Sequence, residues 1–238
     1  SEGLDLFVHP RTVALESLGS GLLRDLEGQT SNDVSMSDLA FHTLREYEPG
    51  DDRRYIHWRS SAKASGASGQ SAFMVRQFLD TRRSHVAVVV DVDEAAYTHP
   101  DEFELALSCG ASVTLRALAD EMETTVVCGT QSAVQPAPHT ALDTYSRAAF
   151  GPWPLPAATS RLGTLAPDVS AVVLVTGPLT TFEVLQRARA YLAPQVRLVA
   201  VQVVPDSALS YREGAGIVVV TLAELSELPL VLAGGVTA

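Results

Sequence analysis

The chain has 238 residues, of which 46% are hydrophobic and 19% are charged, so it is long enough to bury the core of one large or two small domains. Its 28 acidic residues outnumber 17 basic residues. The resulting net charge of −11 argues against nucleic acid as a partner, because phosphate binding requires a basic surface. No apolar run in the sequence reaches the length of a membrane helix.

Residues 1–83 are predicted to form an extension of strands and loops in front of a larger domain. Alternating apolar residues over 4–9 indicate a strand. The segment 64–71 is rich in Gly, Ser and Ala, which indicates a flexible linker. A second strand is predicted over 73–78, directly after this linker.

The segment 45–63, called the signature segment below, concentrates charged and aromatic side chains around a Pro-Gly pair. Pro49 and Gly50 mark a tight turn, because proline fixes φ and glycine permits positive values. Carboxylates follow this turn within reach of several arginines, and guanidinium groups pair with carboxylates in bidentate geometry. We therefore interpret the segment as an ordered, ion-paired loop that is anchored by Ile56 and Trp58.

From residue 84 onward, apolar runs of strand length alternate with segments of helix length. The continuous apolar run over 85–90 is typical of a strand that is buried on both faces. Further elements are predicted as strands over 124–128, 171–175, 196–203 and 217–220, an edge strand near Val134, helices over 101–121, 139–149 and 181–192, and a proline-rich loop over 152–156. This alternation predicts a doubly wound α/β domain over 84–238, with a mostly parallel sheet covered on both sides.

Acidic residues follow the first buried strand of this domain at Asp91, Asp93 and Glu94. Doubly wound sheets bind ligands at the carboxyl ends of their strands, where the strand order reverses. Asp91 and Asp93 are therefore candidate ligands for a divalent cation such as Mg²⁺, which prefers oxygen ligands. The interpretation that we favour is an acidic loop that holds no metal.

The signature segment resembles the bacterial family called domain of unknown function 58. The matching motif reads Arg-Glu-Tyr-x-Pro-Gly-Asp-Asp-x-Arg-x-Ile-x-Trp and is followed by Ser-Ala and a basic residue. Its positions are Arg45, Glu46, Tyr47, Pro49, Gly50, Asp51, Asp52, Arg54, Ile56, Trp58, Ser61, Ala62 and Lys63. A later Val-Arg-x-Phe piece matches at Val75, Arg76 and Phe78. We expect a structural or interaction role for the signature residues and assign no catalytic residue.

The resemblance also implies that the α/β domain is similar to von Willebrand factor type A domains. In that superfamily, an Asp-x-Ser-x-Ser motif and a later Thr-Asp-Gly motif hold Mg²⁺ or Mn²⁺. Here Asp91 remains, Asp93 and Ala95 replace the two serines, and Gly177 occupies the position of the later carboxylate. We therefore expect a degenerate metal site at Asp91 and Asp93 and no bound cofactor, with Mg²⁺ binding as the alternative.

The resemblance further implies a partnership with an AAA+ ATPase of the MoxR type. It places the full-length protein at the cytoplasmic side of a membrane, through segments outside this chain. We therefore expect a non-catalytic interaction or adaptor module whose recognition edge is the acidic loop 91–94. Two alternatives stay open, namely a hydrolase that uses the signature segment, for which Ser61 is the residue to test, and a Mg²⁺-dependent binding module.

Overall fold

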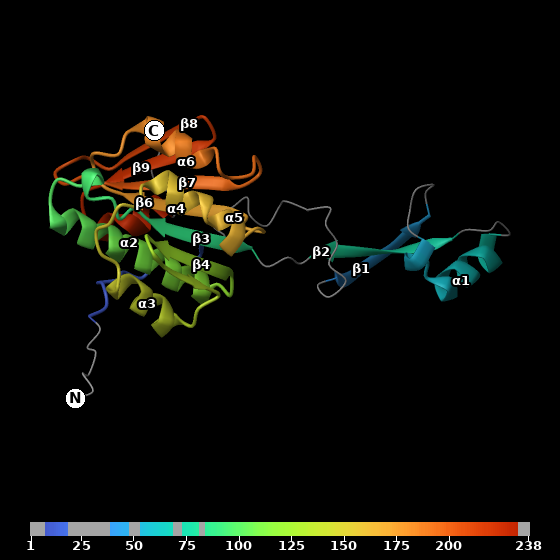
Figure 1. Cartoon of the computed structure of the whole chain (residues 1–238). Coiled ribbons are helices and arrows are strands. Elements are labelled where there is room, and N and C mark those ends of the chain that lie inside the picture. Colours follow the sequence, from blue (N-terminus) through green and yellow to red (C-terminus); the bar gives the residue numbers. More distant parts are fainter. Residues whose placement is uncertain (1–7, 19–38, 48–52, 69–72, 81–83, 233–238) are drawn as a thin grey trace. The chain divides into compact units, whose positions relative to one another are not determined.

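The chain folds into two compact units, called the α/β unit and the smaller unit below (Figure 1). The computed structural model describes residues 8–18, 39–47, 53–68, 73–80 and 84–232. The α/β unit contains residues 8–18 and 84–232, and the other described residues form the smaller unit.

The α/β unit is built on a seven-stranded sheet with the strand order β5-β4-β3-β6-β7-β9-β8 (Figure 1). Its strands are β3 (His85–Val90), β4 (Glu123–Cys128), β5 (Gln131–Val134), β6 (Ala171–Thr176), β7 (Arg197–Val203), β8 (Ser210–Gly214) and β9 (Ile217–Leu222). The five inner strands are parallel, and the edge strands β5 and β8 are antiparallel to their neighbours. The predicted α/β class with a mostly parallel sheet is therefore confirmed.

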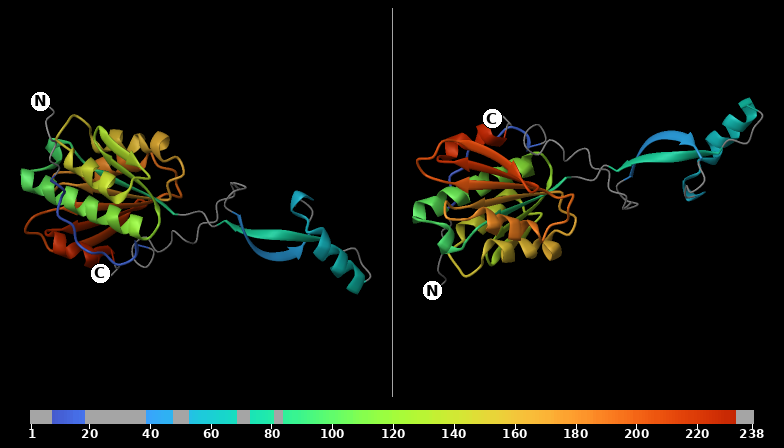
Figure 2. Two further views of the ribbon diagram at one scale, coloured as in Figure 1. Left: turned by 90° about the horizontal axis from the view of Figure 1, so that it is seen from below. Right: turned by 90° about the horizontal axis from the view of Figure 1, so that it is seen from above.

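Helices cover both faces of this sheet, as Figure 2 shows. The helical elements are η4 (Glu94–Ala96), α2 (Pro100–Ala119), α3 (Pro138–Ser146), α4 (Leu155–Ser160), α5 (Leu162–Leu165), α6 (Phe182–Arg189), η5 (Leu225–Glu227) and α7 (Leu228–Leu232). One core lies between the sheet and α2, α3 and α7, and the other lies between the sheet and α4, α5 and α6. Within the described ranges, no helix combines the length and the apolar character that crossing a membrane requires.

Strand β3 shows why the central elements form where the sequence predicts them. Its β-branched valines favour extended backbone, and all six residues are buried. Val86, Val88 and Val90 enter the core under α2, while Ala87 and Val89 enter the core under α4 and α6. This alternation follows from the two-residue period of a strand that is covered on both sides.

The start of helix α2 is stabilised by a proline in its first turn and by a capping box. Pro100 occupies the first turn, where its missing N–H is not needed. The Glu102 carboxylate accepts hydrogen bonds from the backbone N–H groups of Thr98 and His99, at 2.7 and 3.3 Å. These contacts satisfy two backbone donors that the helix itself leaves unpaired, so the helix start is well defined.

The elements of the α/β unit that were not predicted include strand β8 and helix α4. Strand β8 has the polar sequence Ser-Tyr-Arg-Glu-Gly and pairs only with β9 at the edge of the sheet. Helix α4 begins at Leu155, inside the segment that was predicted to be a proline-rich loop. Pro156 does not prevent this, because a proline in the first turn of a helix removes no helical hydrogen bond.

Residues 8–18 belong to the expected N-terminal extension, and they pack on the α/β unit. Leu15 and Leu18 are buried in the core under α2. The backbone N–H of Leu18 donates to the Asp120 carboxylate at 2.9 Å. Within the strand predicted over 4–9, residues 8 and 9 have no strand structure, and the rest lie outside the described residues.

The described residues of the smaller unit form an antiparallel strand pair, a short 3-10 helix and one α-helix. Strand β1 (Leu39–Glu46) pairs with β2 (Met74–Asp80), and η3 (Arg53–Tyr55) and α1 (Trp58–Ser68) lie between them in the chain. The predicted linker over 64–71 is therefore wrong up to residue 68, because α1 continues to that point. His57 stabilises the start of α1, since its Nδ1 accepts the backbone N–H of Ser60 at 3.2 Å.

Candidate functional site

The candidate site lies at the carboxyl ends of β3 and β6, which are adjacent parallel strands in the centre of the sheet. After β3 the chain continues to β4 on one side, and it returns later to β6 on the other side. The strand order reverses between β3 and β6, and such a reversal opens a crevice at the carboxyl ends of the two strands. Asp91 directly follows β3, and Thr176 is the last residue of β6.

Asp91 lies at the base of this site with 2% of its surface exposed, and its carboxylate is hydrogen-bonded within the protein. Oδ1 accepts the backbone N–H of Asp93 at 3.1 Å, and Oδ2 accepts the Thr176 hydroxyl at 2.7 Å. The Thr180 hydroxyl lies 3.5 Å from Oδ2. Burial raises the pKa of Asp91 to about 6, because removal from water disfavours the charged form more than these hydrogen bonds favour it.

The loop after β3 is held in place by contacts on both sides of Asp93. The Asp93 carboxylate accepts the backbone N–H of Ala95 at 3.1 Å and so caps the turn η4. The Tyr97 hydroxyl donates to the backbone carbonyl of Asp91 at 2.7 Å. The Tyr97 ring packs edge-on against Phe103, with 5.4 Å between the ring centroids. Burial raises the pKa of Tyr97 well above its ordinary value, so this hydroxyl stays a donor.

Gly177 lies where the loop after β6 meets the loop after β3. A Cβ atom at this position would overlap the carbonyl oxygen of Ala96 and would lie 2.5 Å from Cδ1 of Tyr97. The two loops are also joined by a hydrogen bond from the backbone N–H of Leu179 to the Ala96 carbonyl, at 3.0 Å. The position at which the resembled metal motif carries its later carboxylate therefore has no room for a side chain in this fold.

A crevice of about 720 Å³ opens beside Asp91 and Asp93, between the loops and helices α4 and α6. Most of its lining is apolar, and the contributing residues include Ala95, Ala96, Pro154, Leu155, Pro156, Ala157, Leu179, Val184, Ala190 and Tyr191. Leu179 and Tyr191 are 54% and 58% exposed. Arg187 adds a positive charge, and its Nε lies 3.9 Å from the Glu183 carboxylate.

Few oxygen ligands for a cation face this crevice. Among the described residues that line it, the carboxylates are those of Asp91 and Asp93, and the hydroxyl groups are those of Ser160, Thr180 and Tyr191. Both Asp91 oxygens already accept hydrogen bonds from the protein. Mg²⁺ is usually held by one or two carboxylates, with water completing its octahedral geometry. The degenerate metal site expected at Asp91 and Asp93 therefore stays a prediction.

The structure distributes the signature residues over several elements of the smaller unit. Arg45 and Glu46 end β1, Tyr47 follows it, Arg54 lies in η3, and Trp58 and Ser61 lie in α1. Pro49, Gly50, Asp51 and Asp52 lie outside the described residues. The proposed ion pairing of this segment therefore stays a prediction.

The two expected anchors of the signature segment differ in burial. Ile56 is buried and forms a β-bridge with Val75, so its anchoring role is supported. Trp58 is 64% exposed, so it is not buried within the smaller unit, and its role as an anchor stays a prediction. Its indole packs edge-on against Phe73 at 6.0 Å between centroids, and Phe73 contacts Tyr47 in the same way at 6.4 Å. The three aromatic rings therefore form a cluster that is exposed at Trp58.

Ser61 connects α1 to β2. Its buried hydroxyl accepts the backbone N–H of Met74 at 2.8 Å and donates to the His57 carbonyl at 3.1 Å. A hydroxyl that is bonded to two backbone groups is poorly placed to act as a nucleophile. The nearby contact between Ser60 Oγ and His57 Nδ1, at 2.8 Å, belongs to the cap of α1.

Replacing Ser61 with alanine is expected to destabilise the smaller unit by about 1–3 kcal/mol, because the Met74 N–H would lose its acceptor. Hydrogen exchange of the peptide that contains β2, measured by mass spectrometry, should become faster by about tenfold or more. Ala62→Ser, at an exposed position of the same helix turn, is the control and should change little. Unchanged exchange in Ser61→Ala would show that this hydrogen bond does not hold the unit together.

A comparison with protein family models gives a match over residues 43–227, to the family described as Protein of unknown function DUF58. The chain belongs to this family. The DUF58 match begins in β1 and ends in η5, so it includes residues of both units. The family expected from the signature segment is thereby confirmed. Comparisons with the curated proteins and with the solved structures found no significant match.

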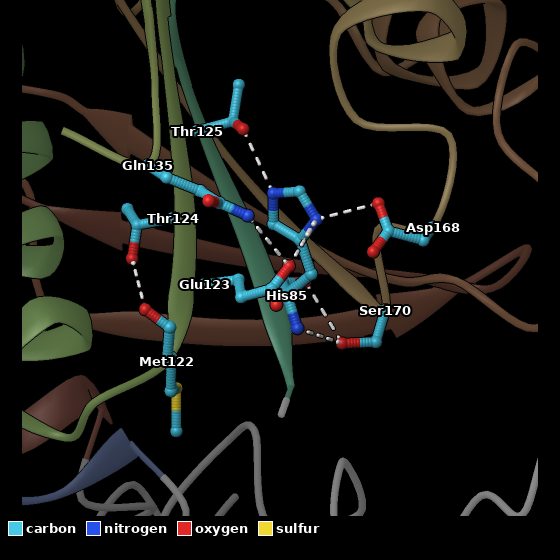
Figure 3. A network of polar contacts seen from close by, with 8 residues as sticks. All are labelled: His85, Met122, Glu123, Thr124, Thr125, Gln135, Asp168 and Ser170. Atoms are coloured by element: carbon cyan, nitrogen blue, oxygen red, sulfur yellow. Dashed lines mark hydrogen bonds and ion pairs between the residues drawn. The ribbon is translucent and has the colours of Figure 1, made fainter. Parts of the chain in front are cut away.

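One polar cluster of this DUF58 chain was not predicted from the sequence. His85, Glu123 and Asp168 lie together at the amino ends of the strands, at the opposite end of the sheet from Asp91 (Figure 3). His85 was counted within the apolar run that predicts β3, and no short spacing connects the three residues. The pairing of β3 with β4 makes His85 and Glu123 direct partners in the register. Hydrogen bonds between His85 and Ser170 place the loop that carries Asp168 beside them.

Proposed function

We propose that this DUF58 chain is a non-catalytic interaction module and that the crevice beside Asp91 binds a segment of a partner protein. The observation that carries this proposal is the mostly apolar crevice, with Leu179 and Tyr191 exposed beside a carboxylate that is bonded internally. Concave apolar surfaces with a few polar groups are the usual sites of binding. The buried Asp91 shapes this surface and does not carry out chemistry on a bound molecule.

The charges beside the crevice define the kind of segment that fits. Asp93 lines the crevice, and the exposed Glu94 lies beside it in η4. An apolar anchor of the partner would pack against Leu179 and Tyr191, and a basic side chain next to that anchor would face the acidic loop. This arrangement corresponds to the common design of an apolar contact with a charged rim.

We further propose that the α/β unit is similar to von Willebrand factor type A domains and that the partner is a MoxR-type AAA+ ATPase. The resemblance of the signature segment supports both points, and the mostly parallel sheet with a site after its central strand agrees with the first. A position of the full-length protein at the cytoplasmic side of a membrane belongs to the same proposal. We also propose that this binding needs no metal, because both Asp91 oxygens already accept hydrogen bonds from the protein.

Charged or polar substitutions in the crevice are expected to weaken binding of the ATPase by tenfold or more. Leu179→Asp and Tyr191→Ser each remove an exposed apolar anchor, and such anchors provide most of the energy of an interface. The matched control is Leu230→Asp in α7, because Leu230 is equally exposed at 59% and does not line the crevice. Surface plasmon resonance with purified chain and purified ATPase from the same organism gives the affinities, in Mg²⁺ and in EDTA.

Each alternative outcome of this experiment has a definite meaning. Equal affinity of the wild type, Leu179→Asp and Tyr191→Ser would reject the crevice as the contact surface. If only Trp58→Ser lost affinity for the ATPase, the contact surface would instead be the aromatic cluster of the smaller unit. Binding that disappears in EDTA would favour the Mg²⁺-dependent module. Because the ATPase itself can need Mg²⁺ to hold its nucleotide, the comparison is repeated with the nucleotide-free ATPase.

A further inference from the structure

The cluster of His85, Glu123 and Asp168 combines residues from three parts of the α/β unit. His85 is the first residue of β3, Glu123 is the first residue of β4, and Asp168 lies in the loop before β6 (Figure 3). The Ser170 hydroxyl accepts the backbone N–H of His85 and donates to its carbonyl, both at 3.0 Å. These bonds fix the end of β3 next to the loop that carries Asp168.

Both carboxylates converge on one nitrogen of the His85 ring. Nδ1 lies 2.9 Å from Oδ1 of Asp168 and 3.9 Å from Oε2 of Glu123. All three ligand atoms lie within 4.8 Å of one another. His85 is 3% exposed, while the Glu123 and Asp168 side chains are 35% and 42% exposed. The cluster therefore has a buried base and an open side toward solvent.

The groups around the cluster hold its members in orientation. The other ring nitrogen of His85, Nε2, lies 2.9 Å from the buried Thr125 hydroxyl (Figure 3). The Gln135 amide donates to Oε2 of Glu123 at 3.1 Å. A histidine that ligates a metal normally has its second nitrogen bonded in this way, which fixes the ring and its tautomer. Here Thr125 leaves Nδ1 as the nitrogen that points toward the two carboxylates.

We propose that His85, Glu123 and Asp168 bind a divalent transition metal ion, and that Zn²⁺ is the ion best matched to this site. Zinc bonds of about 2.0–2.2 Å to nitrogen and oxygen place tetrahedral ligand atoms roughly 3.4 Å apart. The observed separations of 2.9 and 3.9 Å lie on both sides of this value, so small side-chain rotations suffice. Two carboxylates balance the charge of the ion, and imidazole selects zinc over Mg²⁺. Three protein ligands leave the fourth position to water on the open side.

Titration calorimetry of the full chain with Zn²⁺ tests this proposal. We expect one ion per chain for the wild type. Asp168→Asn and Glu123→Gln should each raise the Kd by tenfold or more, since each removes an exposed ligand without disturbing the core. The matched control is Asp101→Asn, because Asp101 also lies beside a histidine nitrogen, at 3.3 Å from His99 Nδ1, but is 90% exposed. Its Kd should equal that of the wild type.

Two further measurements separate a metal site from a simple ion pair between His85 and the acids. Thr125→Val should raise the Kd for zinc by about 10–100-fold, the usual effect of losing a supporting hydrogen bond. Zinc should raise the Tm of the wild type and of Asp101→Asn, but not that of Asp168→Asn, because an ion that binds only the folded state stabilises it. Cys109 and Cys128 should not compete, since both are buried.

Several results would overturn the proposal. A wild type that shows neither heat nor a Tm shift with Zn²⁺ would identify the cluster as an ion pair. The same conclusion would follow if Asp168→Asn and Glu123→Gln bound zinc as tightly as the wild type. Equal affinity for Mg²⁺ and Zn²⁺ would contradict a role of the imidazole as a ligand. None of these results bears on the crevice, which lies at the other end of the sheet.

Discussion

Asp91→Asn is expected to stabilise the α/β unit by about 2–3 kcal/mol at pH 8 and to have little effect at pH 4. Burial raises the pKa of Asp91 to about 6, whereas an aspartate in the unfolded chain titrates near its ordinary value of 3.8. The folded state therefore binds the proton more tightly than the unfolded state. The stability that this carboxyl group contributes is complete below pH 4 and is lost as the pH rises through about 6.

Asparagine removes the buried charge and can still make both kinds of contact. Its carbonyl oxygen can accept the Asp93 N–H, and its amide can donate to the Thr176 hydroxyl, which accepts as well as donates. Urea denaturation at pH 4 and pH 8 gives the two free energies of unfolding. Asp206→Asn is the control, because Asp206 is exposed and has a positive φ of 59°, a conformation that asparagine tolerates.

Destabilisation by Asp91→Asn at both pH values would contradict this expectation. It would show that the hydrogen bonds to the charged Asp91 carboxylate stabilise the fold by more than burial of that charge costs. The predicted result has a functional meaning. A carboxylate that lowers stability at neutral pH, at the carboxyl end of a central strand, is the kind of group that binding sites contain. The same variant should then be compared with the wild type for binding of the ATPase that we propose as the partner.

The central strands could be predicted because strands that are buried on both faces consist of continuous apolar runs. The apolar run 85–90 corresponds to β3, and the helix predicted over 101–121 corresponds to α2, Pro100–Ala119. Edge strand β8 has no such signal, because its side chains are mostly polar and one side of its backbone pairs with no strand in the described part of the chain. It is specified by a hairpin turn in which Ala215 and Gly216 both have positive φ.

Helix α1 was missed for the opposite reason, since its local composition argues against a helix. Gly, Ser and Ala dominate residues 64–68, and Gly and Ser are weaker helix formers than Ala. Contacts outside the helix stabilise it, among them the His57 cap and the hydrogen bond from Met74 to Ser61. Tertiary contacts of this kind regularly override local propensity, and a single sequence does not reveal them.

The candidate site was predictable in its position and not in its details. The rule on strand ends identifies Asp91, because the first buried strand ends directly before it. The roles of Thr180 and of the crevice between α4 and α6 depend on how the two loops and the helices pack. His85, Glu123 and Asp168 illustrate the same limit, since strand order, register and the placement of the loop before β6 bring them together.

Gly177→Ala is expected to destabilise the α/β unit by about 2–4 kcal/mol, because overpacking against backbone is among the more severe single changes. The new methyl group would overlap the Ala96 carbonyl, a backbone group that cannot move without breaking its hydrogen bond to Leu179. Chemical denaturation of both proteins at pH 7 measures the loss. The matched control is Gly163→Ala in α5, where a Cβ atom meets nothing within 4 Å and alanine is the better helix former. That variant should be as stable as the wild type or slightly more stable.

The outcome also bears on the proposed similarity of this site to the metal motif of von Willebrand factor type A domains. If Gly177→Ala is strongly destabilised, Gly177→Asp must be destabilised as well, since it carries the same Cβ atom and a charge in addition. The later carboxylate of the motif then cannot be restored by one substitution, because the loop of Ala96 and Tyr97 occupies its space. A Gly177→Ala protein with wild-type stability would show that the loop of Ala96 and Tyr97 moves at little energetic cost to make room for the methyl group. The edge of the crevice would then lack the rigidity that a preformed binding surface requires.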